Sequence, residues 1–89
     1  MADPIKVIAQ EITLTTKSTV SDASLVRVVN TNDTTDALIT LRNSGNTIIG
    51  TFTLGNSTAD FSNEYVVKQP TDTLEASGGT VKAVSVAYR

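Results

Sequence analysis

Short apolar runs, separated by polar and turn-forming stretches, make up most of this chain. In Glu11–Thr15 apolar and polar residues alternate, so that Ile12 and Leu14 share one face. Such alternation predicts half-buried β-strands, and no run has the ten or more periodic residues of a helix. The expected strand regions are 5–9, 11–15, 25–29, 37–42, 47–54, 64–68 and 80–89. The pattern predicts an all-β fold, a small antiparallel β-sandwich of about six to eight short strands, Ig-like or jelly-roll-like.

Two regions carry more specific expectations. Leu25–Val29 is apolar almost throughout, which predicts a strand covered on both faces. Asn43–Asn46 predicts a tight hairpin, because Gly45 and Asn46 both tolerate positive φ. In the strand that follows, Phe52 is expected to face the core, together with the other residues of its alternating set, Ile48, Gly50 and Leu54.

The C-terminal third contains two further turn signals. Pro70–Ala76 is expected to form a compact turn with at most one bridging strand pair. Within it, Asp72 would bond backbone N–H groups and Leu74 would close the end of the sandwich. Ser77–Gly79 predicts a second hairpin. Residues 1–89 form one domain, and residues 1–9 are either its first strand or an arm that adds a strand to a neighbour.

Composition argues against an enzyme. Threonine, valine and isoleucine provide 31 of the 89 residues, whereas histidine, cysteine and tryptophan are absent. Histidine is the usual base near neutral pH, and cysteine or a histidine-activated serine is the usual strong nucleophile. The absence of cysteine also removes disulfides and thiolate metal sites, as expected of a protein made in a reducing cytoplasm. We therefore expect no catalytic, cofactor or metal site.

Charge and hydropathy narrow the class of partner. The net charge is −2, and the seven Lys and Arg residues are spread thinly, so clustered cations for nucleic acid are not expected. No apolar run approaches membrane-spanning length, so no membrane partner is expected. The N-terminal segment lacks the basic and long apolar regions of a signal peptide.

Several polar clusters are candidate sites. An oxygen-rich loop at Asn30, Asn32, Asp33 and Asp36 has the donor type for calcium, but lacks the glycine and terminal Glu of an EF-hand, so turn-forming Asn and Asp side chains are the simpler interpretation. The carboxylates available for glycoside hydrolysis are Asp60, Glu64, Asp72 and Glu75, and their spacing does not bring two together.

Arg27 and two aromatic residues were also considered. Arg27 lies either on the solvent face of an edge strand or in the interior paired with Asp72 or Glu75. Phe61 and Tyr65 are either sugar-stacking residues or parts of the core and its cover.

Three stretches in fixed order resemble a known group of proteins. They are Leu25–Thr31, Asn46–Leu54 and Val67–Ala76, followed by the closing Val84–Tyr88. Together they resemble small structural proteins of marine tailed phages, cyanophages in particular, over about residues 24–89. The Lys68–Leu74 segment is the distinctive part. The resemblance implies a virion-associated β-sandwich, such as a capsid decoration or a neck or tail accessory protein, and carries over no catalytic residue.

These observations lead to two main hypotheses of function, with a hydrolase or other enzyme as a third. The first is a non-enzymatic virion structural protein, made in the host cytoplasm, that contacts other virion proteins and forms a homo-oligomer, a dimer or trimer. Its motive is that one small sandwich can hardly cover both Ile5–Ala9 and Leu25–Val29. The alternative is a carbohydrate- or cell-surface-binding module, with ligands from the loops Gly55–Asn63 and Asn30–Asp36.

Overall fold

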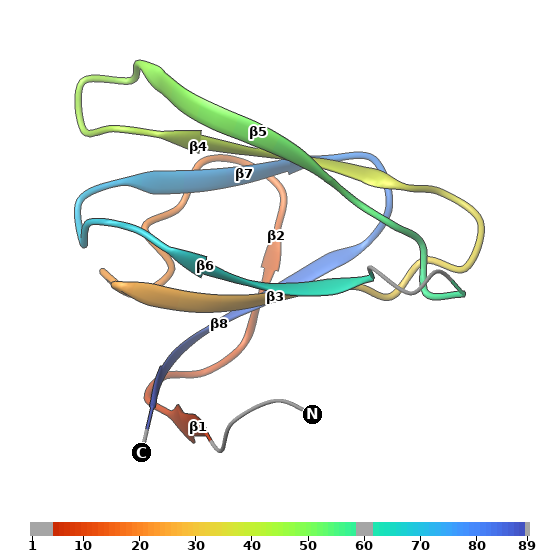
Figure 1. Ribbon diagram of the computed structural model, residues 1–89, viewed down its shortest axis with the longest axis horizontal. Coiled ribbons are helices and arrows are strands. Elements are labelled where there is room, and N and C mark those ends of the chain that lie inside the picture. The colour runs from red at the N-terminus through yellow and green to blue at the C-terminus, as the bar shows by residue number, and fades with distance from the viewer. Residues whose placement is uncertain (1–4, 59–61, 89) are drawn as a thin grey trace.

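The computed structural model describes residues 5–58 and 62–88 and contains eight short strands in two antiparallel sheets packed face to face (Figure 1). The five-stranded sheet contains β1 (Ile5–Val7), β2 (Ile12–Leu14), β3 (Leu25–Asn30), β6 (Asn63–Val67) and β8 (Val81–Tyr88). The three-stranded sheet contains β4 (Ala37–Arg42), β5 (Ile48–Leu54) and β7 (Thr73–Ser77). The expected all-β sandwich is therefore confirmed. Among the described residues, no helix is long and apolar enough to cross a membrane.

The two sheets are built around β8 and β4. Strand β8 pairs with β3 along one edge and with β2 and then β1 along the other, and β3 also pairs with β6. In the second sheet β4 lies between β5 and β7. The connection from β4 to β5 joins two strands that are hydrogen-bonded neighbours. Four connections between described strands cross from one sheet to the other: β3 to β4, β5 to β6, β6 to β7 and β7 to β8.

The main core lies between the sheets. Val26 and Val28 of β3 point inward and are fully buried, as are Ile39 of β4, Leu54 of β5 and Leu74 of β7. Successive strand residues point to opposite faces, so the alternation in the sequence delivers these side chains to one interior. Burying each one contributes about 1.5–3 kcal/mol.

The strand Leu25–Val29, expected to be covered on both faces, is buried on its inner face and only partly covered on its outer face, where Arg27 and Val29 are half-buried. Leu25 points outward, yet it is buried in a second cluster with Val84 and Val86, against which Tyr65 packs. This partial cover within one chain weakens the motive for an oligomer. The expected first strand also forms in part, because Ile5–Val7 pairs with β8 of the same chain. Residues 1–4 of the alternative arm lie outside the described residues.

The Asn43–Asn46 hairpin is confirmed, with two corrections. Asn46 adopts φ of 69°, whereas Gly45 is not in the left-handed region. The turn is held by the Asn43 Oδ1 atom, which accepts hydrogen bonds from the N–H groups of Gly45 and Thr47 at 2.9 and 3.0 Å. Phe52 packs against the core but is half-buried. Ile48, expected on the same face, is 52% exposed, because a β-bulge opposite Leu41 and Arg42 breaks the alternation.

Two expectations for the C-terminal third were wrong. The segment after Pro70 turns only as far as Asp72, and Thr73–Ser77 is a full strand that pairs with β4. Leu74 accordingly lies in the core of the sandwich. Gly78 and Gly79 have φ of 83° and 64°, but β7 and β8 belong to different sheets, so this turn is a crossover and not a hairpin.

Candidate functional site

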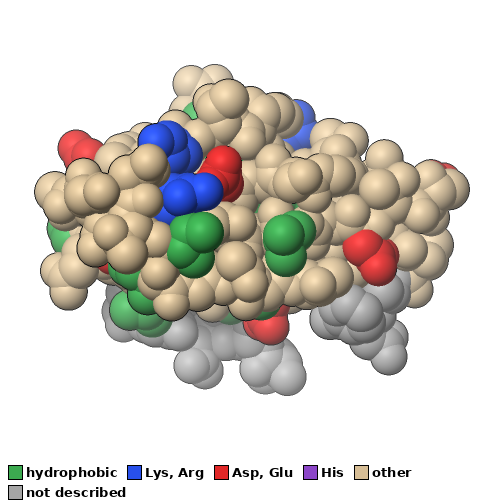
Figure 2. All heavy atoms as spheres, turned by 90° about the horizontal axis from the view of Figure 1, so that it is seen from above, with side chains coloured by type: hydrophobic (Ala, Val, Ile, Leu, Met, Phe, Trp, Pro, Cys, Tyr) green, Lys and Arg blue, Asp and Glu red, His purple; other side chains and the backbone are tan. Residues whose placement is uncertain are grey.

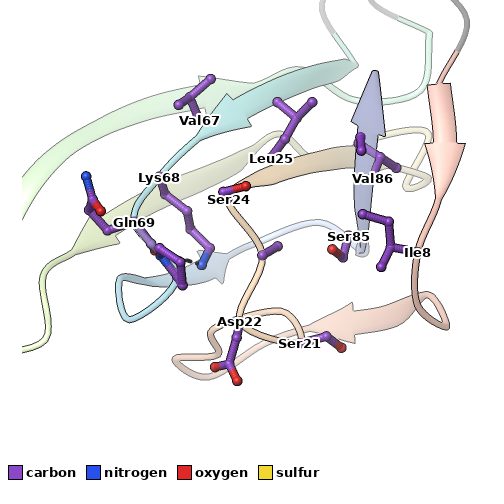
Figure 3. Close-up of a pocket in the computed structure, with 13 residues that line it drawn as sticks. Ile8, Ser21, Asp22, Ser24, Leu25, Val67, Lys68, Gln69, Ser85 and Val86 are labelled. Atoms are coloured by element: carbon purple, nitrogen blue, oxygen red, sulfur yellow. Dashed lines mark hydrogen bonds between the residues drawn. The ribbon is translucent and has the colours of Figure 1, made fainter. Parts of the chain in front are cut away.

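A groove of about 590 Å³ opens at one end of the sandwich. Figure 3 shows Ile8, Ser85 and Val86 along one side, Lys68 and Gln69 along the other, and Ser21 and Asp22 between them. These residues come from four segments that are distant in sequence: the residue after β1, the connection between β2 and β3, the segment after β6, and the C-terminal half of β8. The tertiary fold therefore makes this groove, because its walls come from distant parts of the sequence.

The connection between β2 and β3 forms an unusual wall of this groove. Val20, Ser21 and Asp22 have φ of 53°, 60° and 54°, three successive residues in the left-handed region. For L-residues this conformation costs about 1–2 kcal/mol each, and it is especially unfavourable for β-branched valine. Two features hold the turn: the Val20 side chain is buried in the core, and Ala23 N–H donates to the Thr19 carbonyl at 3.2 Å. No glycine marks this turn in the sequence, which is why the sequence analysis missed it.

Lys68 is the charged residue at the groove that sequence reasoning did not single out. It is only 6% exposed, and its Nζ atom donates to the Gln69 carbonyl at 3.2 Å. Burial lowers the pKa of Lys68 from its ordinary value, while the carboxylates of Asp72 and Asp22 partly oppose this by favouring the charged amine. Its ammonium group thus lies in a largely apolar groove, balanced by two carboxylates.

Asp72 has the role expected of it. Its side chain is buried, and Oδ2 accepts a hydrogen bond from Gln69 N–H at 3.1 Å. The backbone closes the same turn, because Asp72 N–H donates to the Gln69 carbonyl at 2.9 Å. The prediction that Asp72 holds this turn is confirmed. Asp72 thereby fixes the segment that carries Lys68 into the groove.

An apolar band crosses the outer face of the five-stranded sheet and forms part of the lining of the groove. We define it by Val67, Leu25, Val86 and Val7, with Ile8 next to it. The pairings Leu25–Val67 and Val7–Val86, together with Val26–Ser85 between β3 and β8, place the four band residues in one row across four strands. Leu25 and Val86 are buried, whereas Val67, Val7 and Ile8 are 78%, 64% and 60% exposed. The exposed apolar side chains thus lie at the two ends of the row, with buried Leu25 and Val86 between them. Exposed apolar side chains grouped on one face make this band a candidate interaction surface.

The oxygen-rich loop after β3 is a set of turns. Asn32 Oδ1 accepts from the N–H groups of Thr34 and Thr35, both at 2.9 Å, and Asp36 Oδ1 accepts from Asn56 N–H at 3.0 Å. Among the described residues, no three or more His, Cys, Asp or Glu side chains are grouped so as to hold a metal ion. The expected turn-forming role of this loop is confirmed.

Asn30, a candidate calcium ligand in the sequence, is a buried side chain that hydrogen-bonds three separate segments of the chain. Its Nδ2 donates to the Thr35 carbonyl at 2.9 Å and to the Leu54 carbonyl at 3.4 Å. Its Oδ1 accepts from the N–H groups of Asn32 and Thr80, both at 3.1 Å. The loop after β3, the end of β5 and the start of β8 are thus fixed to one side chain.

The carboxylates considered for hydrolysis have separate positions. Glu75 Oε1 accepts from Arg42 Nε at 2.6 Å, Asp72 holds its own turn, and Glu64 lies exposed on β6. Asp60 lies outside the described residues. The three described carboxylates therefore do not share one site.

The structure also decides some of the alternatives for Arg27 and the two aromatic residues. Arg27 is half-buried on the outer face of β3, a strand with neighbours on both sides, so the edge-strand expectation was wrong. Glu75, one expected partner, pairs with Arg42 instead. Tyr65 packs against the outer cluster, and Phe61 lies outside the described residues.

Comparison of the chain with protein-family models, with curated proteins and with solved structures found no match.

Proposed function

We propose that this chain is a non-enzymatic virion structural protein, a capsid decoration or head or tail accessory subunit. It acts through protein–protein contacts, chiefly those of the apolar band. The observation that carries the proposal is the exposure of Val7, Ile8 and Val67 beside a groove in so small a domain. The placement in a virion comes from the resemblance of residues 24–89 described above.

The energetics of the band favour an accessory role on a repeating surface. Full burial of one aliphatic side chain contributes about 1.5–3 kcal/mol, and association costs an estimated 4–15 kcal/mol. The exposed part of Val7, Ile8 and Val67 therefore supports only a weak isolated contact. When several copies are held on one assembly, each further contact is effectively intramolecular, so the overall affinity for the assembly is much higher than that of one isolated contact. A homo-oligomer, a dimer or trimer, has the same advantage and is part of the proposal.

Protein contacts are favoured over glycan binding by the state of the loops. The connections after β3 and after β5 do lie together, since Ser57 N–H donates to the Asn32 carbonyl at 2.7 Å and Asn56 bonds Asp36. However, these bonds use the polar groups that would hold a sugar. In the described part of these loops the side chains of Asn32, Asp36 and Asn56 are thus bonded within the chain. The apolar side chains of Val67, Val7 and Ile8 are instead exposed.

The proposal is tested on particles of the phage whose genome encodes the chain. Mass spectrometry of purified virions should detect it at a fixed ratio to a known structural protein. Purified chain should also sediment with particles that lack it, and Val67→Asp should abolish this while the control Leu38→Asp, on the opposite sheet, should not. Both side chains are exposed, at 78% and 45%, so neither change should unfold the domain. Absence from purified virions together with saturable binding to a glycan panel would overturn the proposal.

A further inference from the structure

One edge of the three-stranded sheet is open. Strand β5 pairs with β4 on one side, and the described residues place no strand on its other side. The opposite edge of this sheet, at β7, is met by the segment after β2. There Ser18 and Leu74 exchange backbone hydrogen bonds at 2.9 Å in both directions, and Ala76 N–H donates to the Thr15 carbonyl at 3.4 Å. One edge of this sheet, at β7, is thus bonded to another segment of the chain, whereas the described residues leave the other edge, at β5, open.

The ladder determines which backbone groups of β5 are free to bond a partner. Because Leu74 directs its N–H and C=O to Ser18, its partner across β4, Leu41, directs its own groups to Gly50 of β5. Antiparallel ladders alternate, so Phe52 and Leu54 also bond β4. Thr51 and Thr53 consequently direct their N–H and C=O groups to the open edge.

This edge lacks the features that keep natural edge strands apart. Charged side chains, proline, bulges and short length usually prevent pairing between edges. Strand β5 has seven residues with no charge and no proline, and its bulge lies near its start, next to Arg42. Ile48 and Ile49 are 52% and 55% exposed. The surface toward the viewer in Figure 2, on the β5 side of the molecule, is mostly uncharged.

We infer that β5 pairs antiparallel with β5 of a second copy, which would join two three-stranded sheets into one of six strands. A second copy fits because a two-fold axis makes an antiparallel edge its own complement. With the axis at Phe52, Thr51 of each copy bonds Thr53 of the other through four backbone hydrogen bonds. No charge of β5 opposes itself across this axis, whereas the open edge of β6 would bring Glu64 close to its own copy.

The dimer should be weak in solution. A single strand edge buries less than the roughly 800 Å² per partner typical of stable dimers, so association should depend strongly on concentration. The inference deepens the homo-oligomer part of the proposed function by naming the surface that pairs. Its test uses pure protein and the other sheet, so a failure here leaves the binding of virion proteins by the apolar band to be decided by the particle experiments.

Sedimentation velocity up to about 1 mM protein tests the association. The parent should change from monomer to dimer with rising concentration, and Thr51→Lys should weaken the dimer at least about tenfold, because each copy adds a charge next to the other. The control is Thr16→Lys, an exposed threonine in the segment that meets the opposite edge of this sheet, at β7. A parent that stays monomeric throughout, or two lysine variants that behave alike, would overturn the inference.

Cysteine cross-linking tests the register, and the chain has no cysteine to interfere. Bonded antiparallel partners have Cα atoms about 5.5 Å apart, within disulfide range. A mixture of Thr51→Cys and Thr53→Cys should therefore oxidise to a heterodimer faster than Thr16→Cys oxidises to a homodimer. Equal rates would mean that β5 edges meet only at random, and would contradict the pairing.

Discussion

Removal of the Asn30 side chain should be among the most damaging single changes to this fold. Asn30 is fully buried and makes four hydrogen bonds, to Asn32, Thr35, Leu54 and Thr80. Each such bond contributes about 1 kcal/mol net, and a buried group left without a partner costs about 1–3 kcal/mol. Asn30→Ala should therefore lower the free energy of unfolding by about 3–5 kcal/mol. At about 0.05–0.15 kcal/mol per residue, the whole domain has about 4–13 kcal/mol.

Urea denaturation followed by circular dichroism measures this loss. The matched control is Asn32→Ala, which removes three hydrogen bonds accepted by one side chain within a single surface loop and should cost about 1 kcal/mol. In thermal melts, each kcal/mol lowers Tm by about 4–8 °C for a domain of this size. An Asn30→Ala variant within about 1 kcal/mol of the parent would refute the view that this side chain ties the three connections together.

Asn30→Asp is a sharper test, because the new side chain has nearly the same shape but replaces the Nδ2 donor with an acceptor oxygen. Two of the four hydrogen bonds, those to the carbonyls of Thr35 and Leu54, would then be lost. The new carboxylate would face the carbonyls of Thr35 and Leu54, which Nδ2 now contacts. Burial next to carbonyl oxygens raises a carboxyl pKa in the folded state, so the folded variant binds more protons than the unfolded chain. Its stability should therefore fall as pH rises above about 4 and recover on acidification. A variant whose loss relative to the parent is the same at pH 4 and pH 7 would contradict this account.

Three further changes test the groove and the crossover. Asp72→Ala should cost about 1–2 kcal/mol in urea denaturation by removing the bond to Gln69 N–H; no loss would contradict its holding role. Lys68→Met should raise Tm at pH 7, because burial disfavours the charged ammonium of the parent. The difference in Tm between the variant and the parent should shrink above pH 10.5, where Lys68 of the parent is neutral in both the folded and the unfolded state. A lower Tm of the variant at pH 7 would show that attraction to the carboxylates of Asp72 and Asp22 outweighs the cost of burial. Gly79→Ala should cost about 2 kcal/mol or more, since its Cβ would lie 2.7 Å from Asn30 Oδ1 at φ of 64°, whereas Gly45→Ala, with 3.4 Å to Asn43 Oδ1, should be tolerated; equal losses would remove the steric argument.

The sequence by itself determined the local elements. Alternation and β-branched residues placed seven of the strands to within one or two residues, because strand periodicity is a local property of the chain. The Asn43–Asn46 hairpin and the bond made by Asp72 were likewise predictable, since both use groups only a few residues apart. The strand after Asp72 was missed because only pairing with β4 extends it.

The tertiary structure alone decided which strands pair and what the surface presents. Gly78 and Gly79 permit either a hairpin or a crossover, so the local sequence does not choose between them. In the folded chain this turn is a crossover that packs against Asn30, about fifty residues away. The burial of Lys68, the left-handed turn at Val20–Asp22 and the row that joins Val67 to Val7 each require segments from distant parts of the chain to meet. A local pattern specifies the conformation that a segment prefers, whereas a groove or an open edge exists only once the sheets have assembled.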